Sequence, residues 1–546
     1  MIKDGKIWVG SATDKTACVI LPRMANRHGL VAGATGTGKT VTLKVMAESF
    51  SELGVPVFMA DVKGDIASIT NPGSMNEKIS ERLSVCGADH AAFTPKGCPV
   101  TFWDIYGEKG IRLRTTISEM GPILLARILG LNDLQSDLLS IIFKIADDNS
   151  LLLIDTKDLK AMLNYVSEHN KEFAADYGKI APASLSVITR AVVALEIAGG
   201  DRFFGEPDLQ VTDFFTRDSD GKGMINILDS ESLINNGTLY STFLLWLLSE
   251  LFETLPEVGD LDKPKMVFFF DEAHLLFNDA PKALLDKIEQ VVKLIRSKGV
   301  GVYFCTQNPR DIPDGVLAQL GNKVQHALRA YTPADQKAVR AAAESFRVNP
   351  TFDTFDTIMN LATGEAVVSF LDEDGTPGIA QRATILPPAC SLDTLDAGSR
   401  DNLIKSSILY SKYANAVDNQ SAYEELAERA EEEAAAVEQA KKEAAEAAAK
   451  AKEEAAAAKA KEKEAAAAAK AKEKEAAAAA RAKEREEKAA ASAKKRAVKS
   501  VGNSVAGTVG REVGKSMGGT FGKFGKTLGG NLGASLGRGL LGTLFK

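Results

Sequence analysis

The chain has 546 residues, of which 45% are hydrophobic and 25% are charged, so it is long and apolar enough to bury at least one large core. Its five cysteines include no C-x-x-C pair, which argues against a disulfide framework and a zinc site and favours a reducing compartment. The first residues lack the apolar segment of a signal peptide, and no apolar run reaches the length of about 18 residues that a membrane span needs. We therefore expect a globular, cytoplasmic protein.

The formal net charge of −7 is distributed unevenly along the chain. Residues 421–500 carry a net +1 and residues 501–546 a net +5, which leaves −13 for the first 420 residues. Phosphate binding requires clustered Lys and Arg side chains, so an acidic domain of this kind does not wrap nucleic acid over its outer surface. Any nucleic-acid site in the first 420 residues must be local.

Residues 1–395 alternate short apolar runs with longer helical patterns, which is typical of an α/β domain with a mostly parallel sheet. Most of the short runs are apolar throughout, as expected for strands that are covered on both faces. The predicted strands are residues 29–32, 55–60, 224–228, 266–270, 300–305, 324–328 and 366–371. Between residues 111 and 199 the pattern changes to long amphipathic stretches, which predicts a mostly helical insertion.

After a connector at 396–420, residues 421–500 consist mainly of Ala, Glu, Lys and Arg, with 35 Ala in 80 residues. These are strong helix formers, and Glu438 and Lys442 have the favourable i,i+4 spacing. An unbroken helix of this length would extend about 120 Å. The segment KAKEKEAAAAA occurs twice, at residues 459 and 470, and its 11-residue period predicts a nearly straight helix. Two roles stay open for this helix, a solvated spacer and association through its Ala face.

The last segment, residues 501–546, is basic and contains 14 Gly at mostly four-residue spacing, with apolar residues in step. Small residues at this spacing let two helices approach closely, and a basic amphipathic helix can lie on an anionic membrane. Each Gly nevertheless costs a helix about 1 kcal/mol relative to Ala. Disorder until binding, attachment to a membrane or protein partner, and self-association are therefore all considered for residues 501–546.

The most specific motif is GATGTGKT, which matches G-x-x-x-x-G-K-[ST] between a predicted strand and a helical pattern. Its glycines let successive backbone N–H groups surround an anion, and the following helix N-terminus adds partial positive charge. We expect Lys39 to contact the β and γ phosphates of ATP and Thr40 to offer its hydroxyl to Mg²⁺. The predicted nucleotide-binding residues are Gly33, Ala34, Thr35, Gly36, Thr37, Gly38, Lys39 and Thr40.

A second motif, KPKMVFFFDEAH, ends an apolar strand with two acidic residues. Such side chains emerge at the carboxyl edge of a parallel sheet, beside the phosphate-binding loop. We expect Asp271 to serve the Mg²⁺ shell and Glu272 to polarise the attacking water. The letters DEAH also occur in DEAH-box RNA helicases, but the other motifs of those enzymes are missing here, so we interpret His274 as a coincidence.

A third element follows, because the predicted strand 300–305 ends in Thr306 and Gln307, a polar pair that can sense the γ-phosphate. The three motifs together resemble the HerA/FtsK superfamily of hexameric pumping ATPases. The resemblance covers residues 20–390, includes the DVKGD motif at 61–65, and implies a RecA/FtsK-like P-loop NTPase fold with ATP and Mg²⁺. It also implies that Gln307 is a catalytic sensor and Arg296 an arginine finger for a neighbouring subunit, with Arg329 as a second candidate for that role.

The full layout, including the helix and the Gly-rich end, looks like the bacterial YjgR-like proteins, which are HerA-like. One departure is that only about 28 residues precede the P-loop, whereas archaeal HerA proteins carry a β-barrel there. We therefore do not assign the partner-docking roles of those relatives to this chain.

Three functions are compatible with these features. The first is a ring-forming ATPase, hexameric by the resemblance, that moves double-stranded DNA through its centre, with Lys109, Arg112 and Arg114 as candidates for a basic pore. The second is an ATP-dependent assembly or scaffold protein, attached to a membrane or a protein partner through residues 501–546. The third is a monomeric nucleotide switch or small-molecule kinase. An arginine that acts in trans favours the first function over the third.

Overall fold

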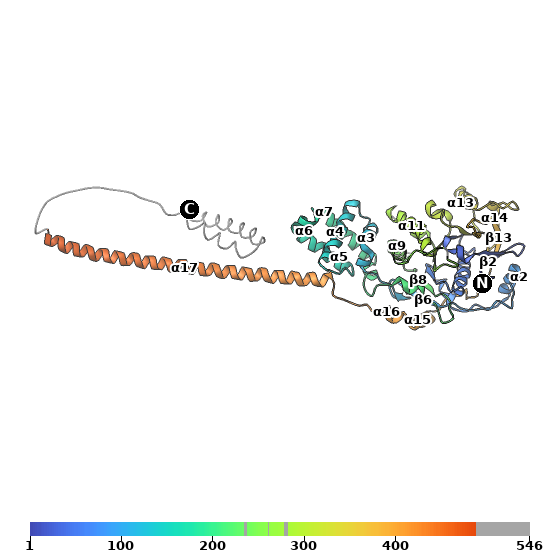
Figure 1. The fold of residues 1–546 in the computed structure, drawn as a ribbon, viewed down its shortest axis with the longest axis horizontal. Coiled ribbons are helices and arrows are strands. Elements are labelled where there is room, and N and C mark those ends of the chain that lie inside the picture. Colours follow the sequence, from blue (N-terminus) through green and yellow to red (C-terminus); the bar gives the residue numbers. More distant parts are fainter. Residues whose placement is uncertain (234–236, 260, 278–281, 488–546) are drawn as a thin grey trace. The chain divides into compact units, whose positions relative to one another are not determined.

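The structure is a computed structural model that describes residues 1–233, 237–259, 261–277 and 282–487. The chain divides into two compact units, Met1–Val437 and Glu438–Lys546. The Gly-rich segment 501–546 and the end of the predicted long helix lie outside the described residues. The first unit contains the P-loop, DVKGD and DEAH motifs and the Thr306–Gln307 pair, and its parts are visible in Figure 1.

The first unit is built on one 13-stranded sheet with the order β1-β2-β13-β12-β11-β4-β10-β9-β5-β8-β6-β7, in which β3 pairs with β2. From β11 to β7 all neighbours are parallel, whereas β12, β13, β2, β1 and β3 join as antiparallel strands. The strands are β1 Ile2–Lys3, β2 Lys6–Ala12, β3 Ala17–Ile20, β4 Gly29–Ala32, β5 Val57–Asp61, β6 Val100–Asp104, β7 Ile111–Arg112, β8 Ile225–Asp229, β9 Met266–Phe270, β10 Val300–Thr306, β11 Asn322–His326, β12 Glu365–Ser369 and β13 Gln381–Ile385.

The parallel strands are apolar because helices cover the sheet on both faces. Every residue of β4, β5, β8, β9 and β10 is buried. Phe268, Phe269 and Phe270 of β9 each contact other aromatic rings, and burying one such side chain contributes roughly 2–3 kcal/mol. The mostly parallel α/β fold is therefore confirmed. All seven predicted strands are present, with ends shifted by at most two residues.

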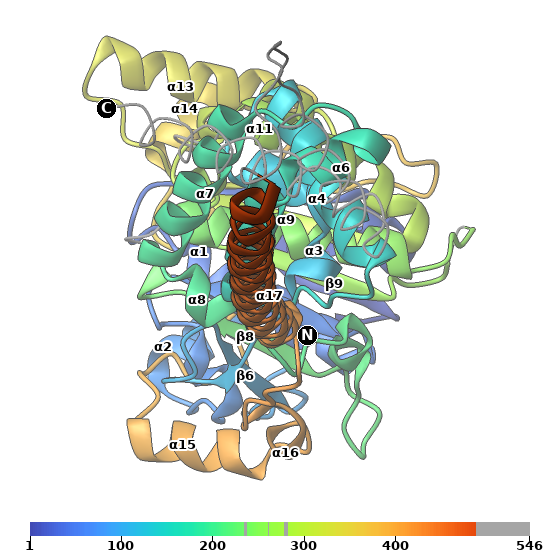
Figure 2. The same cartoon turned by 90° about the vertical axis from the view of Figure 1, so that its left-hand side faces the viewer.

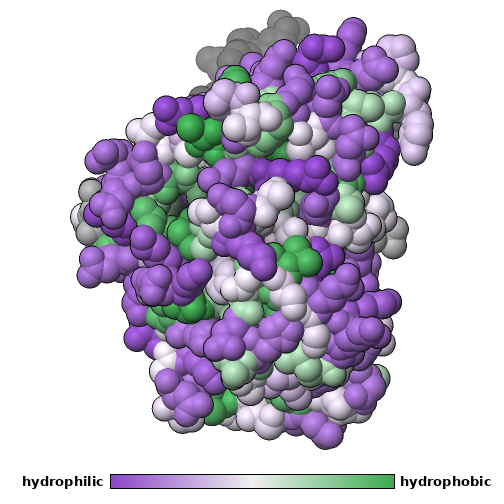
Figure 3. All heavy atoms as spheres, turned by 90° about the vertical axis from the view of Figure 1, so that its right-hand side faces the viewer, coloured by the Kyte–Doolittle hydropathy of each residue, from purple (hydrophilic) through white to green (hydrophobic). Residues whose placement is uncertain are grey.

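Helices fill the rest of the unit, and the last of them, α17, continues past its end at Val437. They are α1 Lys39–Glu52, α2 Glu77–Cys86, α3 Ile117–Ile128, α4 Asp133–Asp148, α5 Thr156–Glu168, α6 Asn170–Tyr177, α7 Pro182–Ile197, α8 Gly200–Phe203, α9 Gly237–Thr254, α10 His274–Phe277, α11 Lys282–Ile295, α12 Asp314–Leu317, α13 Pro333–Glu344, α14 Thr354–Asn360, α15 Ala397–Ser406, α16 Tyr410–Tyr413 and α17 Ala422–Glu487. Figure 3 views one face of the molecule, where hydrophobic residues form small separate areas within a hydrophilic surface.

Helices α3 to α7 occupy the segment in which a helical insertion was expected, and they gather beside one another in Figure 1. Two of them begin with capping boxes, which satisfy free backbone N–H groups, at Asn132 and at Asp155. Among the described residues, no single helix has the length and hydropathy of a membrane span, and only α6 and α7 taken together, bent by 103°, reach those values.

The segment 396–420, expected as a connector, folds onto the sheet as α15 and α16. Figures 1 and 2 show both helices next to β6. Arg400 of α15 pairs with the buried carboxylate of Asp229 at 2.6 Å, and Tyr413 of α16 is fully buried. The first compact unit therefore continues past residue 395, to Val437.

This packing also changes the interpretation of the expected pore cations. Arg114 is only 3% exposed, and its guanidinium donates a hydrogen bond to the Tyr413 carbonyl at 3.0 Å. Lys109 pairs with Glu231 at 2.5 Å, and Arg112 donates to the Arg202 carbonyl at 2.9 Å. The prediction that Arg114 lines a basic pore is therefore wrong, because its charge is used inside the fold.

Helix α17 has 66 described residues, or about 100 Å of helix. Its start is fixed by Asp158 of α5, whose carboxylate accepts hydrogen bonds from the Ser421 hydroxyl at 2.6 Å and from the Tyr423 N–H at 2.9 Å. The expected Glu438–Lys442 pair forms at 2.9 Å. All residues from 430 to 469 are exposed, as in a solvated helix.

Candidate nucleotide-hydrolysis site

The G-x-x-x-x-G-K-T motif forms the connection between β4 and α1 at the carboxyl end of β4. Strand β4 lies in the parallel part of the sheet, between β11 and β10. The loop is held on both sides, because Gly33 N donates to the Thr306 carbonyl at 3.2 Å and Ala34 N to the Ala327 carbonyl at 2.9 Å. Gly38 adopts φ +115°, which only glycine reaches without strain, and this turn sends the chain into α1. The expected strand, loop and helix are thus present.

Lys39 lies inside the concave side of this loop. It is 7% exposed, and its ammonium donates hydrogen bonds to the carbonyls of Gly33 at 2.7 Å and Ala34 at 3.2 Å. These bonds hold the positive charge over the loop that would surround the phosphates. The arrangement is consistent with the role that the sequence predicts for Lys39.

Oxygen atoms that suit a divalent cation lie beside the first turn of α1. The Thr40 hydroxyl donates to Asp65 Oδ2 at 2.9 Å, whereas Asp65 Oδ1 is buried without a hydrogen-bond partner among the described atoms. Asp271, at the end of β9, is 4% exposed. Burial and the neighbouring charge of Glu272 raise the pKa of Asp271.

Mg²⁺ prefers oxygen ligands and keeps several waters or phosphate oxygens. In the part of the chain that the structure describes, no three His, Cys, Asp or Glu residues are arranged to hold a metal ion by themselves. A hydroxyl with two carboxylates fits a magnesium ion whose shell is completed by phosphate oxygens and water. Thr40 and Asp65, which lie within hydrogen-bond distance of each other, offer oxygen ligands of this kind, and the sequence predicts the same role for Asp271.

The loop after β5 that supplies Asp65 is shaped by Asp61. Its carboxylate accepts hydrogen bonds from the backbone N–H groups of Gly64 at 2.8 Å and of Ile66 and Ala67 at 3.1 Å. Burial, and then the neighbouring charge of Asp65, raise the pKa of Asp61 to about 7. Asp61 is thus a structural acid at the edge of the site.

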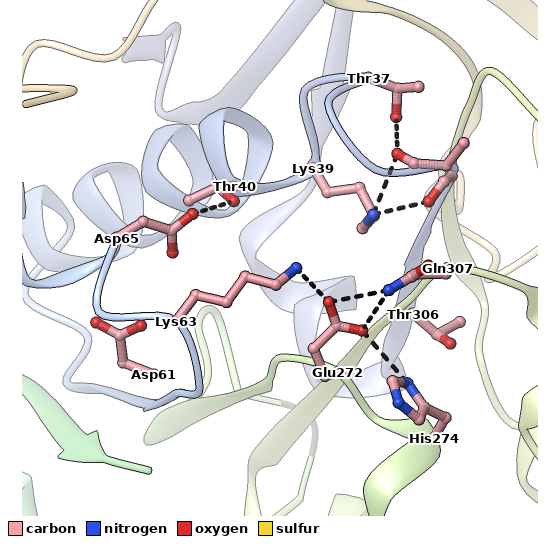
Figure 4. Close-up of polar contacts among 12 residues, drawn as sticks. Thr37, Lys39, Thr40, Asp61, Lys63, Asp65, Glu272, His274, Thr306 and Gln307 are labelled. Atoms are coloured by element: carbon pink, nitrogen blue, oxygen red, sulfur yellow. Dashed lines mark hydrogen bonds and ion pairs between the residues drawn. The ribbon is translucent and has the colours of Figure 1, made fainter. Parts of the chain in front are cut away.

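Glu272 is the centre of the site's hydrogen-bond network (Figure 4). It is 2% exposed, and its carboxylate forms an ion pair with the Lys63 ammonium. The amide nitrogen of Gln307 lies 3.3 and 3.4 Å from its two oxygens, and His274 Nδ1 lies 3.3 Å from Oε2. The backbone of Glu272 adopts φ +46°, a conformation that costs a non-glycine residue about 1–3 kcal/mol and that is typical of functional sites.

The charge state of Glu272 follows from these contacts. Burial alone would raise its pKa, but the hydrogen bond and positive charge of Lys63, followed by the amide of Gln307, lower the pKa below its ordinary value. Glu272 is therefore a carboxylate at neutral pH and can accept a proton from water.

Gln307 lies between Glu272 and the P-loop, because β10 pairs with β4 on one side and with β9 on the other. Thr306, the last residue of β10, accepts from Gly33 of the P-loop and donates its hydroxyl to Asp311 at 2.9 Å. The structure thus brings together Lys39, Glu272 and Gln307, as the sequence predicts.

The two candidate arginines lie elsewhere. Arg296 precedes β10, and the seven residues of that strand separate its amino end from Gln307 by about 20 Å. It is exposed at the opposite edge of the sheet from its own P-loop. Arg329 follows β11 at the P-loop edge, but its guanidinium donates to the carbonyls of Met359 at 2.7 Å and Leu361 at 3.3 Å. A role of either arginine in a neighbouring subunit stays a prediction.

Three contacts of the site were not predicted from the sequence. Lys63 and Asp65 belong to the DVKGD motif, to which no role was assigned, and His274 was interpreted as a coincidence. The adjacency of β5 and β9, which places Lys63 against Glu272, is not visible in the sequence.

His326 is a further support that the sequence does not reveal. It is fully buried beneath the P-loop, and its ring nitrogens lie 2.8 Å from the Thr42 hydroxyl and 2.9 Å from the Glu365 carbonyl. Burial lowers the pKa of His326 to about 4, so the ring is neutral at physiological pH. A Cβ on Gly33 would come within 2.5 Å of His326 Cβ, which explains the glycine at that position.

Comparison with known proteins identifies relatives along most of the chain. A probable helicase of Methanocaldococcus jannaschii is 31% identical over 146 residues, which are 26% of this chain and 26% of that protein. The DNA double-strand break repair helicase HerA of Sulfolobus acidocaldarius is 22% identical over 364 residues, which are 63% of this chain and 62% of HerA. The chain thus spans less than two thirds of these relatives' lengths.

Among solved structures, the bacterial conjugative coupling protein TrwBdeltaN70 is 15% identical with a TM-score of 0.45, over 71% of this chain and 89% of that chain. VirB4 of Thermoanaerobacter pseudethanolicus is 16% identical with a TM-score of 0.44, over 70% of this chain and 97% of that chain. The model of one family, described as helicase HerA-like C-terminal, matches residues 7–526. The chain therefore belongs to the HerA-like helicase C-terminal family.

Proposed function

We propose that this protein is an ATP-hydrolysing motor that assembles into a ring, a hexamer by the resemblance, and moves double-stranded DNA. The observation that carries the proposal is the placement of Glu272. This carboxylate is charged, buried and oriented by Lys63 and Gln307 at the same sheet edge as the P-loop. Such a constellation suits activation of a water molecule next to a bound γ-phosphate.

In the proposed reaction, the backbone N–H groups of residues 33–40 and the Lys39 ammonium hold the triphosphate. Glu272 accepts a proton from a water molecule while the oxygen of that water attacks the γ-phosphorus. The bond between the γ-phosphorus and the oxygen of the departing ADP then breaks. The Gln307 amide holds Glu272 and the water in line. Mg²⁺, held by Thr40, Asp65 and Asp271, would neutralise phosphate charge.

The position of Arg296 supports assembly into a ring. Because strand β10 separates Arg296 from its own site by about 20 Å, an arginine finger at this position would act on a nucleotide bound by another subunit. An arginine supplied in this way makes hydrolysis depend on a neighbour, which lets subunits act in sequence. The archaeal relatives are described as DNA double-strand break repair helicases, which supports DNA as the polymer.

A second candidate is an ATP-dependent assembly or scaffold protein of the cytoplasm that attaches to a membrane or protein partner through residues 501–546. The long solvated part of α17 favours it, because translocation alone has no evident need for an arm of this kind. The acidic charge of the first 420 residues also favours it, since Arg114 is not available for a DNA-binding pore.

Two substitutions separate nucleotide binding from hydrolysis. Lys39→Ala removes a phosphate-binding cation, and we expect it to abolish both ATP binding and turnover. Glu272→Gln keeps the shape of the side chain but cannot accept a proton, so we expect ATP binding within about threefold of the unaltered chain and turnover lowered by about 10²–10⁴-fold. Calorimetry and phosphate release measure the two effects. Full turnover by the Lys39→Ala protein would contradict the proposal.

The pH dependence of turnover tests the role of Lys63. Glu272 is active as a carboxylate, so activity is lost as pH falls through its pKa, which Lys63 holds low. Lys63→Met removes that influence while burial remains, so we expect the acid limb of the pH–rate profile to move to higher pH. Lys63→Arg keeps the charge and should restore the original profile. Lys96→Met, which removes an exposed lysine paired with Glu52, is the matched control. An unchanged profile for Lys63→Met would refute the assignment.

Mixing two inactive variants tests whether Arg296 acts in trans. We expect Arg296→Ala to bind ATP normally and to lose turnover by about 10³-fold or more. A Lys39→Ala subunit still carries Arg296, so it can complete the intact P-loop of an Arg296→Ala neighbour. Turnover should therefore reappear when the two proteins are mixed and allowed to exchange subunits. A mixture as inactive as its components would show that Arg296 does not act across an interface.

DNA dependence separates the two candidate functions. A DNA motor should hydrolyse ATP faster with double-stranded DNA, and this stimulation should fall steeply between about 50 and 200 mM salt because phosphate contacts release counterions. The scaffold function instead predicts turnover that ignores DNA, together with liposome binding that is lost when residues 501–546 are deleted. The same deletion should leave DNA-stimulated turnover intact if the motor function holds.

A further inference from the structure

A cavity of about 190 Å³ adjoins the P-loop on the side of Gly38. Gly38 and Val41, at the start of α1, form one wall, and Ile79 and Arg82 of α2 form the second. The chain that follows β13 closes the third side, including Leu386 and Leu392. Neither the nucleotide-binding lysine nor the catalytic carboxylate lines this space, so it is distinct from the hydrolysis site described above.

The cavity is joined rigidly to the phosphate-binding loop. Gly364, at its rim, donates its N–H to the Thr37 carbonyl at 2.9 Å. A Cβ on Gly38 would come within 3.3 Å of Gly364 Cα, so the two backbones are nearly in contact. Whatever binds in the cavity is therefore held at a fixed position relative to a triphosphate in the loop.

The direction of a bound nucleotide follows from the positions of the catalytic groups. Lys39 reaches the β and γ phosphates, and Glu272 with Gln307 marks the γ end. The α-phosphate must then lie toward the first turn of α1, and the ribose and base continue beyond it. The cavity beside Gly38 and Val41 lies next to that turn.

The lining of the cavity suits the face of an aromatic base. Leu386 is fully buried, Ile385 and the two prolines after it are also buried, and Ile79 is half-buried. Arg82 holds its guanidinium against the carbonyls of Thr363 at 3.2 Å and Gly364 at 3.3 Å. A planar guanidinium that is fixed in this way can stack on a purine ring.

The edge of a base finds no carboxylate or amide side chain in the same cavity. The polar side chains that line it are the cations Lys78 and Arg82 and the hydroxyl-bearing Thr363. The Gly364 carbonyl already accepts a hydrogen bond from Ile385 N at 2.9 Å, as well as the one from Arg82. Adenine and guanine differ in the donors and acceptors of their edges, and a pocket that does not contact those groups discriminates weakly.

We infer that this cavity binds the base and ribose of a nucleoside triphosphate by stacking and shape, and that the enzyme consequently accepts ATP and GTP with similar efficiency. The inference rests on the proposed function, since it takes the P-loop to hold the triphosphate. Discrimination between the two purines, measured as the ratio of kcat/KM values, should be below about 100-fold.

Calorimetry on the full chain with Mg²⁺ and three probes, ATP, GTP and inorganic tripolyphosphate, tests the inference. The unaltered protein should bind ATP and GTP within about tenfold of each other, and both at least about tenfold more tightly than tripolyphosphate. Leu392→Trp should fill the cavity without disturbing the core, because Leu392 is 53% exposed. Ile79→Ser removes a stacking surface instead. Leu134→Trp, a change at another exposed leucine that does not line the cavity, is the matched control.

For Leu392→Trp and Ile79→Ser we expect weaker binding of ATP and GTP, unchanged binding of tripolyphosphate, and a raised KM with kcat retained. Unchanged ATP binding in both variants would overturn the assignment of the cavity, and so would a parallel loss of tripolyphosphate binding. A preference for one purine above about 100-fold would overturn the conclusion on specificity. If the unaltered protein bound neither ATP nor tripolyphosphate, the proposed function itself would fail.

Discussion

Four neighbouring parallel strands, β4, β10, β9 and β5, end at one edge of the sheet, and every contact of the candidate site depends on this shared edge. Each strand delivers one element of the site there. They are the P-loop after β4, Gln307 after β10, Asp271 and Glu272 after β9, and Lys63 with Asp65 after β5. The pairing register of these strands sets the relative heights of the groups, because Gly29 of β4 pairs with Tyr303 of β10 and Met266 of β9 pairs with Val300 of β10.

The second constraint is electrostatic. Asp61, Asp65, Asp271 and Glu272 lie near one another, and the lysines placed among them include Lys39, Lys44 and Lys63. Burial raises the pKa values of Asp61 and Asp271, whereas the contact with Lys63 keeps Glu272 charged. The acidic groups outnumber the lysines in the site, which suits binding of a divalent cation. The contact with Lys63 suits a reaction in which Glu272 must stay deprotonated.

Much of this arrangement could be predicted from the sequence, because its signals are local. The P-loop and the acidic pair each occupy a few consecutive residues, and apolar runs mark the parallel strands. The antiparallel edge could not be predicted, since β2 pairs with β13 across most of the chain. The partners of Glu272 were missed for the same reason, because Lys63 is 209 residues away. Arg114 was misjudged because only the packing of α16 shows that it is buried.

One anchoring contact has a mechanical consequence. Asp158 belongs to the helical insertion, and it fixes the first turn of the long arm by accepting hydrogen bonds from Ser421 and Tyr423. The root of the arm, up to Val437, is thereby clamped to the insertion. Any tilt of the insertion must therefore rotate that root with it.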